Sequence, residues 1–229
     1  MAASGGACAF ILNLKPKNTI STFANWPVDA VIDDNVVGGL LIKHKSGIKL
    51  LPAPTTLEES ELVTSTTINM IWPFLQSNSA YLIVDAGSRF SEPVIPILER
   101  SDIILLLLAP ELVSVKAAYD AMQIFEKFNI DPSKILLVVN NIFPEHPLPL
   151  EKIAAGLKKD ISATIPYDGN AFIQNLNTGY PIILAAPRSE ASLAILSLAY
   201  KLSSKEMESD KITRPSPFLE TIRKIFTAS

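Results

Sequence analysis

From residue 48 onward, short apolar runs alternate with segments in which apolar residues recur every three or four positions. Runs of this length and composition are typical of strands that are buried on both faces. The strand candidates are Ile48–Pro54, Tyr81–Gly87, Ile103–Pro110, Lys134–Asn141 and Ser162–Asp168. Since Ile103–Pro110 is the most apolar of them, we expect it to lie at the centre of the sheet.

The segments between the runs have the period of helices with one buried face. The pattern predicts helices at Glu111–Phe128, Leu150–Leu157, Ala171–Asn177 and Ser189–Leu202, and a weaker one at Asn35–Lys43. Strands that alternate with helices are joined by right-handed crossovers, which make a sheet parallel. The expected fold class is therefore α/β, with a mostly parallel sheet covered by helices on both faces, in a single domain.

The regular pattern ends near residue 203, so we expect residues 1–203 to form the α/β domain. Residues 204–217 are polar and contain prolines, which is typical of a linker. Residues 218–229 include FLETIRKIF, whose apolar side chains can share one helical face. Two roles stay open for Phe218–Phe226: weak association with a membrane, or docking on a protein. We favour docking, because a segment this short and weakly charged is a marginal anchor.

Composition narrows the protein class. The 229 residues are 48% hydrophobic, enough for a large core, and the formal net charge of −3 gives no reason to expect a nucleic-acid surface. One cysteine, Cys8, excludes an intramolecular disulfide and a cysteine-based zinc site, which fits a cytoplasmic protein. His44 and His146 have no second ligand at metal spacing, and we expect both at the surface.

Polar residues follow four of the apolar runs where each run ends. They are Asp85 and Gly87, then Pro110 and Glu111, then Asn140 and Asn141, and then Tyr167 and Asp168. In open α/β sheets, ligands bind at this edge because strand ends and helix N-termini converge there. Each residue alone is ambiguous: Asp85 can cap a turn or helix, and the asparagines and Asp168 can be ordinary turn residues.

The order of the pieces LLPAP, VDAG, VVNN, IPYD and GYPIILAAP resembles the MinD/ParA-type branch of the P-loop ATPases, and in particular the CpaE/TadZ proteins of type IV (tight adherence) pilus assembly. The resemblance extends from about Asn13 to Leu202. It implies a P-loop NTPase fold and ATP and Mg²⁺ as cofactors. It also implies a homodimer, a protein partner in a pilus or secretion apparatus, and recruitment from the cytoplasm to the inner face of the membrane or a cell pole.

The resemblance assigns roles to individual residues. It implies that Asp85 reaches Mg²⁺, directly or through water, and that Gly87 belongs to the switch segment that follows. It implies that Asn140 and Asn141 contact the adenine base, and that Pro166 to Asp168 close over the base from the other side. The chemistry agrees, because an amide both donates to and accepts from a purine edge, and a carboxylate can hold Mg²⁺.

The chain departs from this family near its start. The family opens with a strand and a glycine-rich KGGxGK[ST] loop, whose backbone N–H groups and lysines hold the phosphates. The 229 residues contain no such loop, so the N-terminal part of the domain is expected to be incomplete. We expect the apolar segment Ala7–Leu14 to act as a substitute strand. Lys15 and Lys17 resemble the loop after the second strand and are not assigned to phosphates.

Two explanations for the missing loop stay open. The chain is a shortened copy of an active ATPase, or it is a family member that kept the fold and lost the residues that bind the phosphates. Without the loop, the site loses several charge-assisted hydrogen bonds of about 1.5–3 kcal/mol each, so no catalytic residue is assigned. We therefore expect a CpaE/TadZ-like localisation or scaffold factor without ATPase activity in this form. The alternative is an Mg²⁺-dependent ATPase that dimerises around ATP and whose P-loop lies outside these residues.

Overall fold

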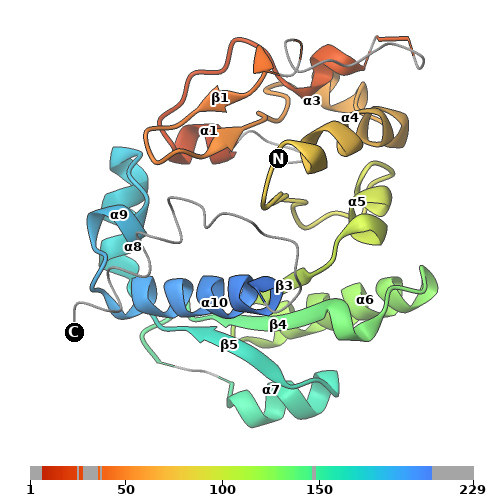
Figure 1. Ribbon diagram of the computed structural model, residues 1–229. Helices are drawn as coiled ribbons and strands as arrows, with labels where there is room; N and C mark the ends of the chain where they lie inside the picture. The colour runs from red at the N-terminus through yellow and green to blue at the C-terminus, as the bar shows by residue number, and fades with distance from the viewer. Residues whose placement is uncertain (1–6, 25, 28–35, 37, 146–147, 208–229) are drawn as a thin grey trace. The chain divides into compact units, whose positions relative to one another are not determined.

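The computed structural model describes residues 7–24, 26–27, 36, 38–145 and 148–207 (Figure 1). The chain divides after Leu98 into two compact units. We call the described residues up to Leu98 unit 1 and the described residues from Glu99 onward unit 2. No helix in the described part of the chain is long and apolar enough to cross a membrane.

Unit 2 is built on a parallel sheet of three strands in the order β3-β4-β5. The strands are β3 (Ile104–Leu108), β4 (Ile135–Asn140) and β5 (Ile161–Ile165). The middle strand, β4, buries Leu137, Val138 and Val139 completely, so it is covered on both faces. A strand in that position has to be apolar throughout, which explains the unbroken run ILLVV.

Helices cover both faces of this sheet. On one face, helices α6 (Leu112–Lys127) and α7 (Leu150–Leu157) pack against Leu137 and Val139. The other face is covered by α8 (Gly169–Thr178), α9 (Ile182–Ala185) and α10 (Glu190–Met207) (Figure 1). Apolar residues of these helices pack around Val138. A one-turn 3₁₀ helix, η2 (Pro132–Lys134), leads into β4. The α/β fold class, the parallel pairing and the helices predicted in this part of the chain are confirmed.

Strand β3 lies at one end of the described sheet, and not at its centre as its composition predicts. Leu107 pairs with Val138, so both side chains lie on the same face of the sheet. Val138 is fully buried there, but Leu107 is 55% exposed and Leu105 is 39% exposed. Helix α10 packs mainly on β5, which leaves the leucines of β3 uncovered by the described helices of unit 2.

Unit 1 combines several helices with a two-stranded antiparallel sheet. Its strands are β1 (Ile42–Lys43) and β2 (Lys49–Leu50). Its helices are α1 (Ala7–Ile11), the 3₁₀ helix η1 (Ile20–Phe23), α3 (Leu57–Glu61), α4 (Ser65–Ser77) and α5 (Val94–Arg100), the last of which continues into unit 2.

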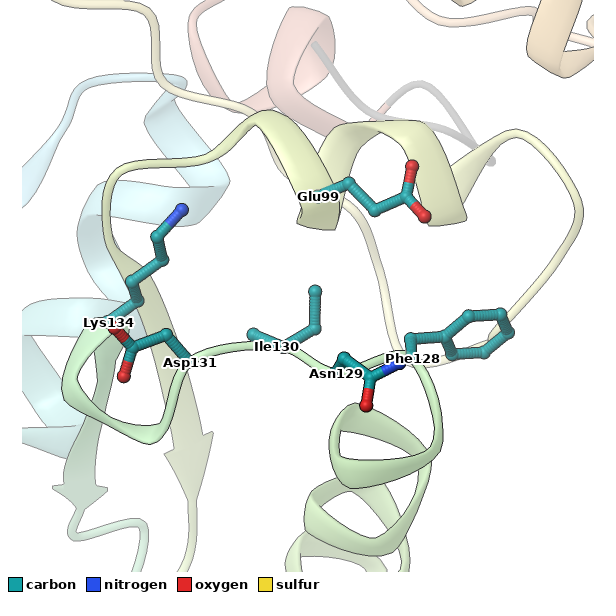
Figure 2. A pocket seen from close by; sticks show the side chains of 6 residues that line it. All are labelled: Glu99, Phe128, Asn129, Ile130, Asp131 and Lys134. Carbon is teal, nitrogen blue, oxygen red and sulfur yellow. The ribbon is translucent and has the colours of Figure 1, made fainter.

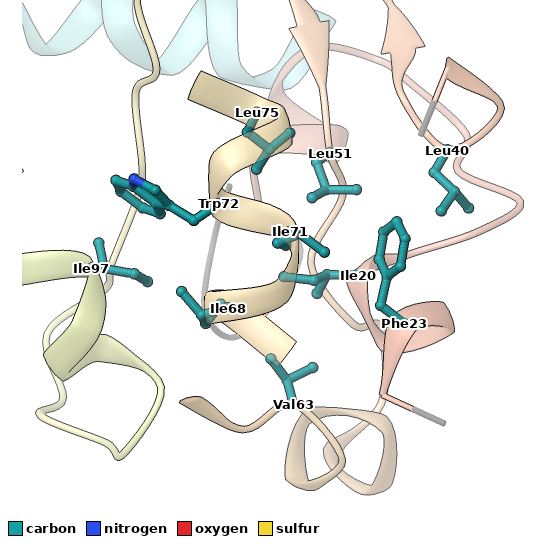
Figure 3. Packing of buried hydrophobic residues seen from close by; sticks show 10 residues of the cluster. All are labelled: Ile20, Phe23, Leu40, Leu51, Val63, Ile68, Ile71, Trp72, Leu75 and Ile97. Carbon is teal, nitrogen blue, oxygen red and sulfur yellow. The ribbon is translucent and has the colours of Figure 1, made fainter. Parts of the chain in front are cut away.

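Helix α4 supplies most of the core of unit 1. Its residues Ile68, Ile71, Trp72 and Leu75 recur at helical spacing and pack against neighbours that include Phe23 (Figure 3). Burial of each such side chain stabilises the fold by about 1.5–3 kcal/mol. The helix begins with a capping box, in which Thr64 and Thr67 each accept a hydrogen bond from the other's backbone N–H.

Three strand predictions for unit 1 do not match the structure. Of Ile48–Pro54, only Lys49–Leu50 is a strand, and it pairs with β1 in the antiparallel sense. Tyr81–Gly87 forms an isolated bridge at Asp85 and no strand. Ala7–Ile11 is helical, so the substitute strand predicted at Ala7–Leu14 is wrong.

Three further predictions fall wholly or partly on residues that the structure does not describe: the helix at Asn35–Lys43, the linker and the segment 218–229. Of the helix predicted at Asn35–Lys43, two residues, Asn35 and Val37, lie outside the described residues; Val36 and Gly38 are helical, and the last two residues form β1. Helix α10 continues to Met207 and so includes the first residues of the predicted linker. The rest of the linker and the segment 218–229 lie outside the described residues.

Candidate functional site

The carboxyl ends of β4 and β5 bring together most of the residues that the sequence nominated. Asn140 lies opposite Ile165 in the strand register, and the backbone N–H of Asn141 donates to the carbonyl of Ile165 at 2.9 Å. This bond places the asparagines beside the loop Pro166–Asp168, which follows β5 directly. The grouping of Asn140, Asn141, Pro166 and Asp168 therefore follows from the parallel pairing of two buried strands.

Asn141 is the most unusual polar residue at this edge. Its side chain is only 5% exposed, and among the described residues the amide oxygen Oδ1 has no hydrogen-bond partner. Leaving a buried acceptor unsatisfied costs about 1–3 kcal/mol, so such atoms usually meet a ligand or water. A donor such as the exocyclic amine of adenine would satisfy it.

The loop after β5 presents a ring and a carboxylate near the same strand ends. The ring of Tyr167, which is 43% exposed, lies so close to Gly169 that a Cβ on that glycine would collide with it. Asp168 occupies the N-cap position of α8, where its carbonyl accepts from the N–H of Phe172 at 3.0 Å. Its carboxylate makes no capping hydrogen bond, so it remains available to a ligand.

Large apolar side chains follow the ends of β3 and β4, and none of them was among the site residues predicted from the sequence. Ile142 and Phe143, after β4, are 50% and 37% exposed, and Leu112 and Val113, at the start of α6, are 74% and 77% exposed. Exposed apolar residues near a site often mark a surface for another protein. The sequence signal was present: Leu112 and Val113 stand at a helix start and outside the apolar stripe of that helix.

Asp85 lies in unit 1, where its carboxylate closes a turn. Its Oδ1 accepts a hydrogen bond from the N–H of Gly87 at 3.1 Å, and its Oδ2 accepts from the thiol of Cys8 at 3.6 Å. Gly87 has a φ of +70°, a backbone angle that favours glycine. Burial and the nearby Asp85 carboxylate raise the pKa of the Cys8 thiol. The turn-capping alternative for Asp85 is therefore realised in the structure.

The amide, ring and carboxylate at the ends of β4 and β5 fit a nucleotide base better than they fit phosphates. Asp85 is an exposed carboxylate of the kind that binds Mg²⁺ through water. Within the described ranges, however, no group of three or more His, Cys, Asp or Glu residues is placed to hold a metal ion.

His44 does not lie at the surface, contrary to what we expected from the sequence. It is only 4% exposed, and its Nδ1 lies 2.7 Å from Ser46 Oγ inside a hairpin turn.

A shallow cavity of about 250 Å³ lies at the other end of β4 (Figure 2). Its walls are made by Glu99, Phe128, Asn129, Ile130, Asp131 and Lys134. Lys134 Nζ donates to the carbonyl of Ser101 at 3.2 Å, and Asp131 accepts from the N–H of Ser133, which lowers the pKa of Asp131. These bonds hold the connection that leads into β4, so we assign them a structural role.

No protein-family model and no curated protein matches this chain. Solved structures do match it. A ParA family ATPase from Chlorobium tepidum superposes with a TM-score of 0.75 at 19% identity, over 87% of this chain and 95% of that chain. The septum site-determining protein MinD from Pyrococcus horikoshii, complexed with Mg-ADP, gives a TM-score of 0.74 at 16% identity, over 92% of this chain and 84% of that chain.

A third structure, the MinC:MinD cell division complex of Aquifex aeolicus, matches with a TM-score of 0.58 at 24% identity, over 91% of each chain. At these levels of identity the agreement concerns the fold. The chain therefore has the α/β fold that these MinD and ParA ATPases share.

Proposed function

We propose that this chain is a localisation or scaffold factor of the CpaE/TadZ kind, which acts in the assembly of a type IV (tight adherence) pilus or secretion apparatus and does not hydrolyse ATP in this form. The proposal is supported by an imbalance between the base side and the phosphate side of the proposed nucleotide site. Asn141 offers a buried acceptor, whereas the 229 residues contain no glycine-rich loop with a lysine.

The imbalance affects catalysis more than binding. Phosphoryl transfer depends almost entirely on backbone N–H groups, lysines and Mg²⁺ that stabilise charge on the transferred group. A base contact contributes to affinity and nothing to that charge. The proposed nucleotide-side residues are Asp85, Gly87, Asn140, Asn141, Pro166 and Asp168, and the one we would assign to Mg²⁺ is Asp85.

Exposed apolar residues near the strand ends support a role in protein recognition. Leu112 and Val113 stand at the start of α6, and Ile142 and Phe143 follow β4. We propose that this surface contacts a partner protein or a second copy of the chain. The solved complex of MinD with MinC is a precedent for a protein of this fold that binds a partner. In this proposal, the protein acts in the cytoplasm and is recruited to the inner face of the membrane or a cell pole.

The second candidate is an Mg²⁺-dependent ATPase that dimerises around ATP. It is favoured by the unsatisfied Oδ1 of Asn141, because an unpartnered buried acceptor is costly unless a ligand supplies the donor. The MinD of Pyrococcus horikoshii, which has the same fold, was solved with Mg-ADP.

A thermal-unfolding titration with ATP and Mg²⁺ separates the two functions. A ligand at 100 times its dissociation constant stabilises the folded state by about 2.7 kcal/mol, which raises Tm by several degrees. We expect no saturable, Mg²⁺-dependent rise in Tm up to millimolar ATP. A saturable rise that disappears in Asn141→Leu but persists in Gln123→Leu, which changes an exposed amide of α6, would show that ATP binds at Asn141. Release of phosphate from ATP under the same conditions would overturn the proposal and favour the ATPase.

A further inference from the structure

The β1–β2 hairpin of unit 1 carries a charge arrangement that works against its own folding (Figure 1). Lys43 lies directly opposite Lys49 in the antiparallel register, and like charges in that position destabilise a strand pair. Residues 42–50 include no aspartate or glutamate. Among the described residues, neither ammonium group forms an ion pair with a carboxylate. Like charges held opposite each other favour a partner that brings negative charge to the hairpin.

The turn of the hairpin is held in one shape. The N–H of His44 donates to the carbonyl of Ile48 at 2.8 Å, and the N–H of Gly47 donates to the carbonyl of His44 at 2.9 Å. Gly47 has a φ of +92°, which a side chain would strain. The buried His44 ring adds a contact of 2.7 Å to Ser46 Oγ. A tip this constrained loses little conformational entropy when it meets a partner.

The base of the hairpin is anchored while its tip is exposed. Leu40 and Leu51 belong to the core around α4, and Leu50 is also buried. At the tip, the apolar residue Ile48 is 48% exposed and stands between Gly47 and Lys49. The hairpin therefore presents an aliphatic side chain and lysines at the end that projects from the core.

Strand alternation limits the kind of surface that the tip can meet. Lys43 and Lys49 lie on one face of the ribbon, and Ile48 lies on the other. Only an end-on approach brings all three side chains to one surface. An approach of this kind suits a broad, flat partner, because the narrow ribbon end has no groove to receive a protein segment.

We propose that the tip of the β1–β2 hairpin docks end-on on an anionic phospholipid surface. The ammonium groups of Lys43 and Lys49 lie among the headgroup phosphates, and Ile48 enters the interfacial region beneath them. An aliphatic side chain between lysines favours lipid over nucleic acid, since residues 42–50 contain no arginine and their aromatic ring, that of His44, is buried and cannot stack on bases. This proposal does not depend on nucleotide binding.

The test is cosedimentation of the full chain with vesicles of phosphatidylcholine, with and without phosphatidylserine. We expect binding only to the anionic vesicles, and we expect salt to weaken it. Each lysine near such a surface contributes about fivefold to the partition constant, so Lys43→Ala/Lys49→Ala should lower it about 25-fold. Residues 218–226 are present in every variant, so any contribution from that segment is the same throughout.

Two further variants separate docking from folding. Lys49→Glu places opposite charges across the hairpin, so we expect Tm to stay level or rise while vesicle binding falls. Ile48→Ser should weaken binding several-fold without changing its salt dependence. The matched control, Lys127→Ala/Lys152→Ala, removes the same charge from exposed positions of α6 and α7 and should bind like the unmodified chain.

Three results would overturn the proposal. The unmodified chain could fail to bind anionic vesicles, or the hairpin variants could bind as well as it does. The chain could also bind duplex DNA in preference to vesicles, with the same lysines required, which would make the hairpin a nucleic-acid contact.

Discussion

Units 1 and 2 contain apolar runs of similar composition, yet only unit 2 turns them into a parallel sheet. ILLVV in unit 2 becomes the buried centre of three parallel strands. YLIV in unit 1, at Tyr81–Val84, forms no strand, and Ile83 is 84% exposed. A strand forms only where another strand pairs with its backbone along its length, so composition alone cannot make one. The contrast teaches that an apolar run indicates where a strand can form, and that the neighbour decides whether it does.

The largest expected effect tests this contrast directly. Leu137→Ala removes a fully buried side chain from the central strand, and we expect it to lower the free energy of unfolding by about 2–5 kcal/mol. Ile83→Ala, which changes an exposed side chain in unit 1, should cost less than about 0.5 kcal/mol. Urea unfolding followed by circular dichroism measures both. If the Ile83 variant lost as much stability as the Leu137 variant, residues 81–84 would have to lie in a buried strand.

The next prediction concerns how unit 1 is stabilised without such a sheet. Ile71 is 1% exposed in the core formed by α4, so Ile71→Ala should also cost about 2–5 kcal/mol. Met70, its neighbour on the helix, only borders that core, and Met70→Ala provides the control, with a smaller loss. Equal losses for the two variants, measured by the same unfolding experiment, would contradict a core organised by one face of α4.

The sequence predicted some elements of the fold and some residues of the site correctly, and others not. Leu150–Leu157 was predicted with both ends correct, because a strong helical period between two strands leaves little freedom. Ala7–Ile11 became a helix although its residues suit a strand, since a five-residue apolar segment carries no period that separates the two. Asn141 was nominated by its place after a strand. Its unsatisfied oxygen could not be foreseen, because burial of a single atom depends on packing from other elements.

Asn141 also gives a prediction with the opposite sign. Asn141→Leu replaces a buried, unsatisfied amide oxygen with apolar atoms, so we expect the free energy of unfolding to rise by about 1 kcal/mol. Sites kept for binding are often less stable than their apolar replacements, and the gain would be consistent with a retained ligand group. Asn140→Leu, one residue earlier and less buried, is the control and should give no gain. A loss of stability in Asn141→Leu would mean that the amide has a partner in solution.

The capping box of α4 should contribute less than the core beneath it. Thr64→Ala removes the side-chain acceptor for the N–H of Thr67, at an expected cost of about 1 kcal/mol. Thr66, an exposed residue in the first turn of the same helix, serves as the comparison, because Thr66→Ala removes a hydroxyl without removing the cap. Equal Tm values for the two variants would contradict the cap.

The smallest expected effect concerns the turn at Asp85. It tests whether the Asp85 carboxylate contacts Cys8 in solution or is open to other ligands. Burial first, and the Asp85 carboxylate second, raise the pKa of Cys8, so less thiolate is present at a given pH and iodoacetamide should react slowly near pH 8. Asp85→Asn removes the second cause and should speed the reaction by a few-fold, which mass spectrometry can follow at this single cysteine.

The sign of the linked effect on stability follows from the same shift. A thiol whose pKa is raised in the folded state contributes stability that is fully present below its unfolded pKa of about 8.5 and is lost as the pH rises through the folded value. The unmodified chain should therefore lose Tm above that pH faster than Cys8→Ala does. Glu92→Gln, a carboxylate change on a different contact to Ser65, should leave the rate of Cys8 alkylation unchanged. If Asp85→Asn also left the rate unchanged, α1 would not rest on Asp85 in solution, and that carboxylate would be open to a metal ion.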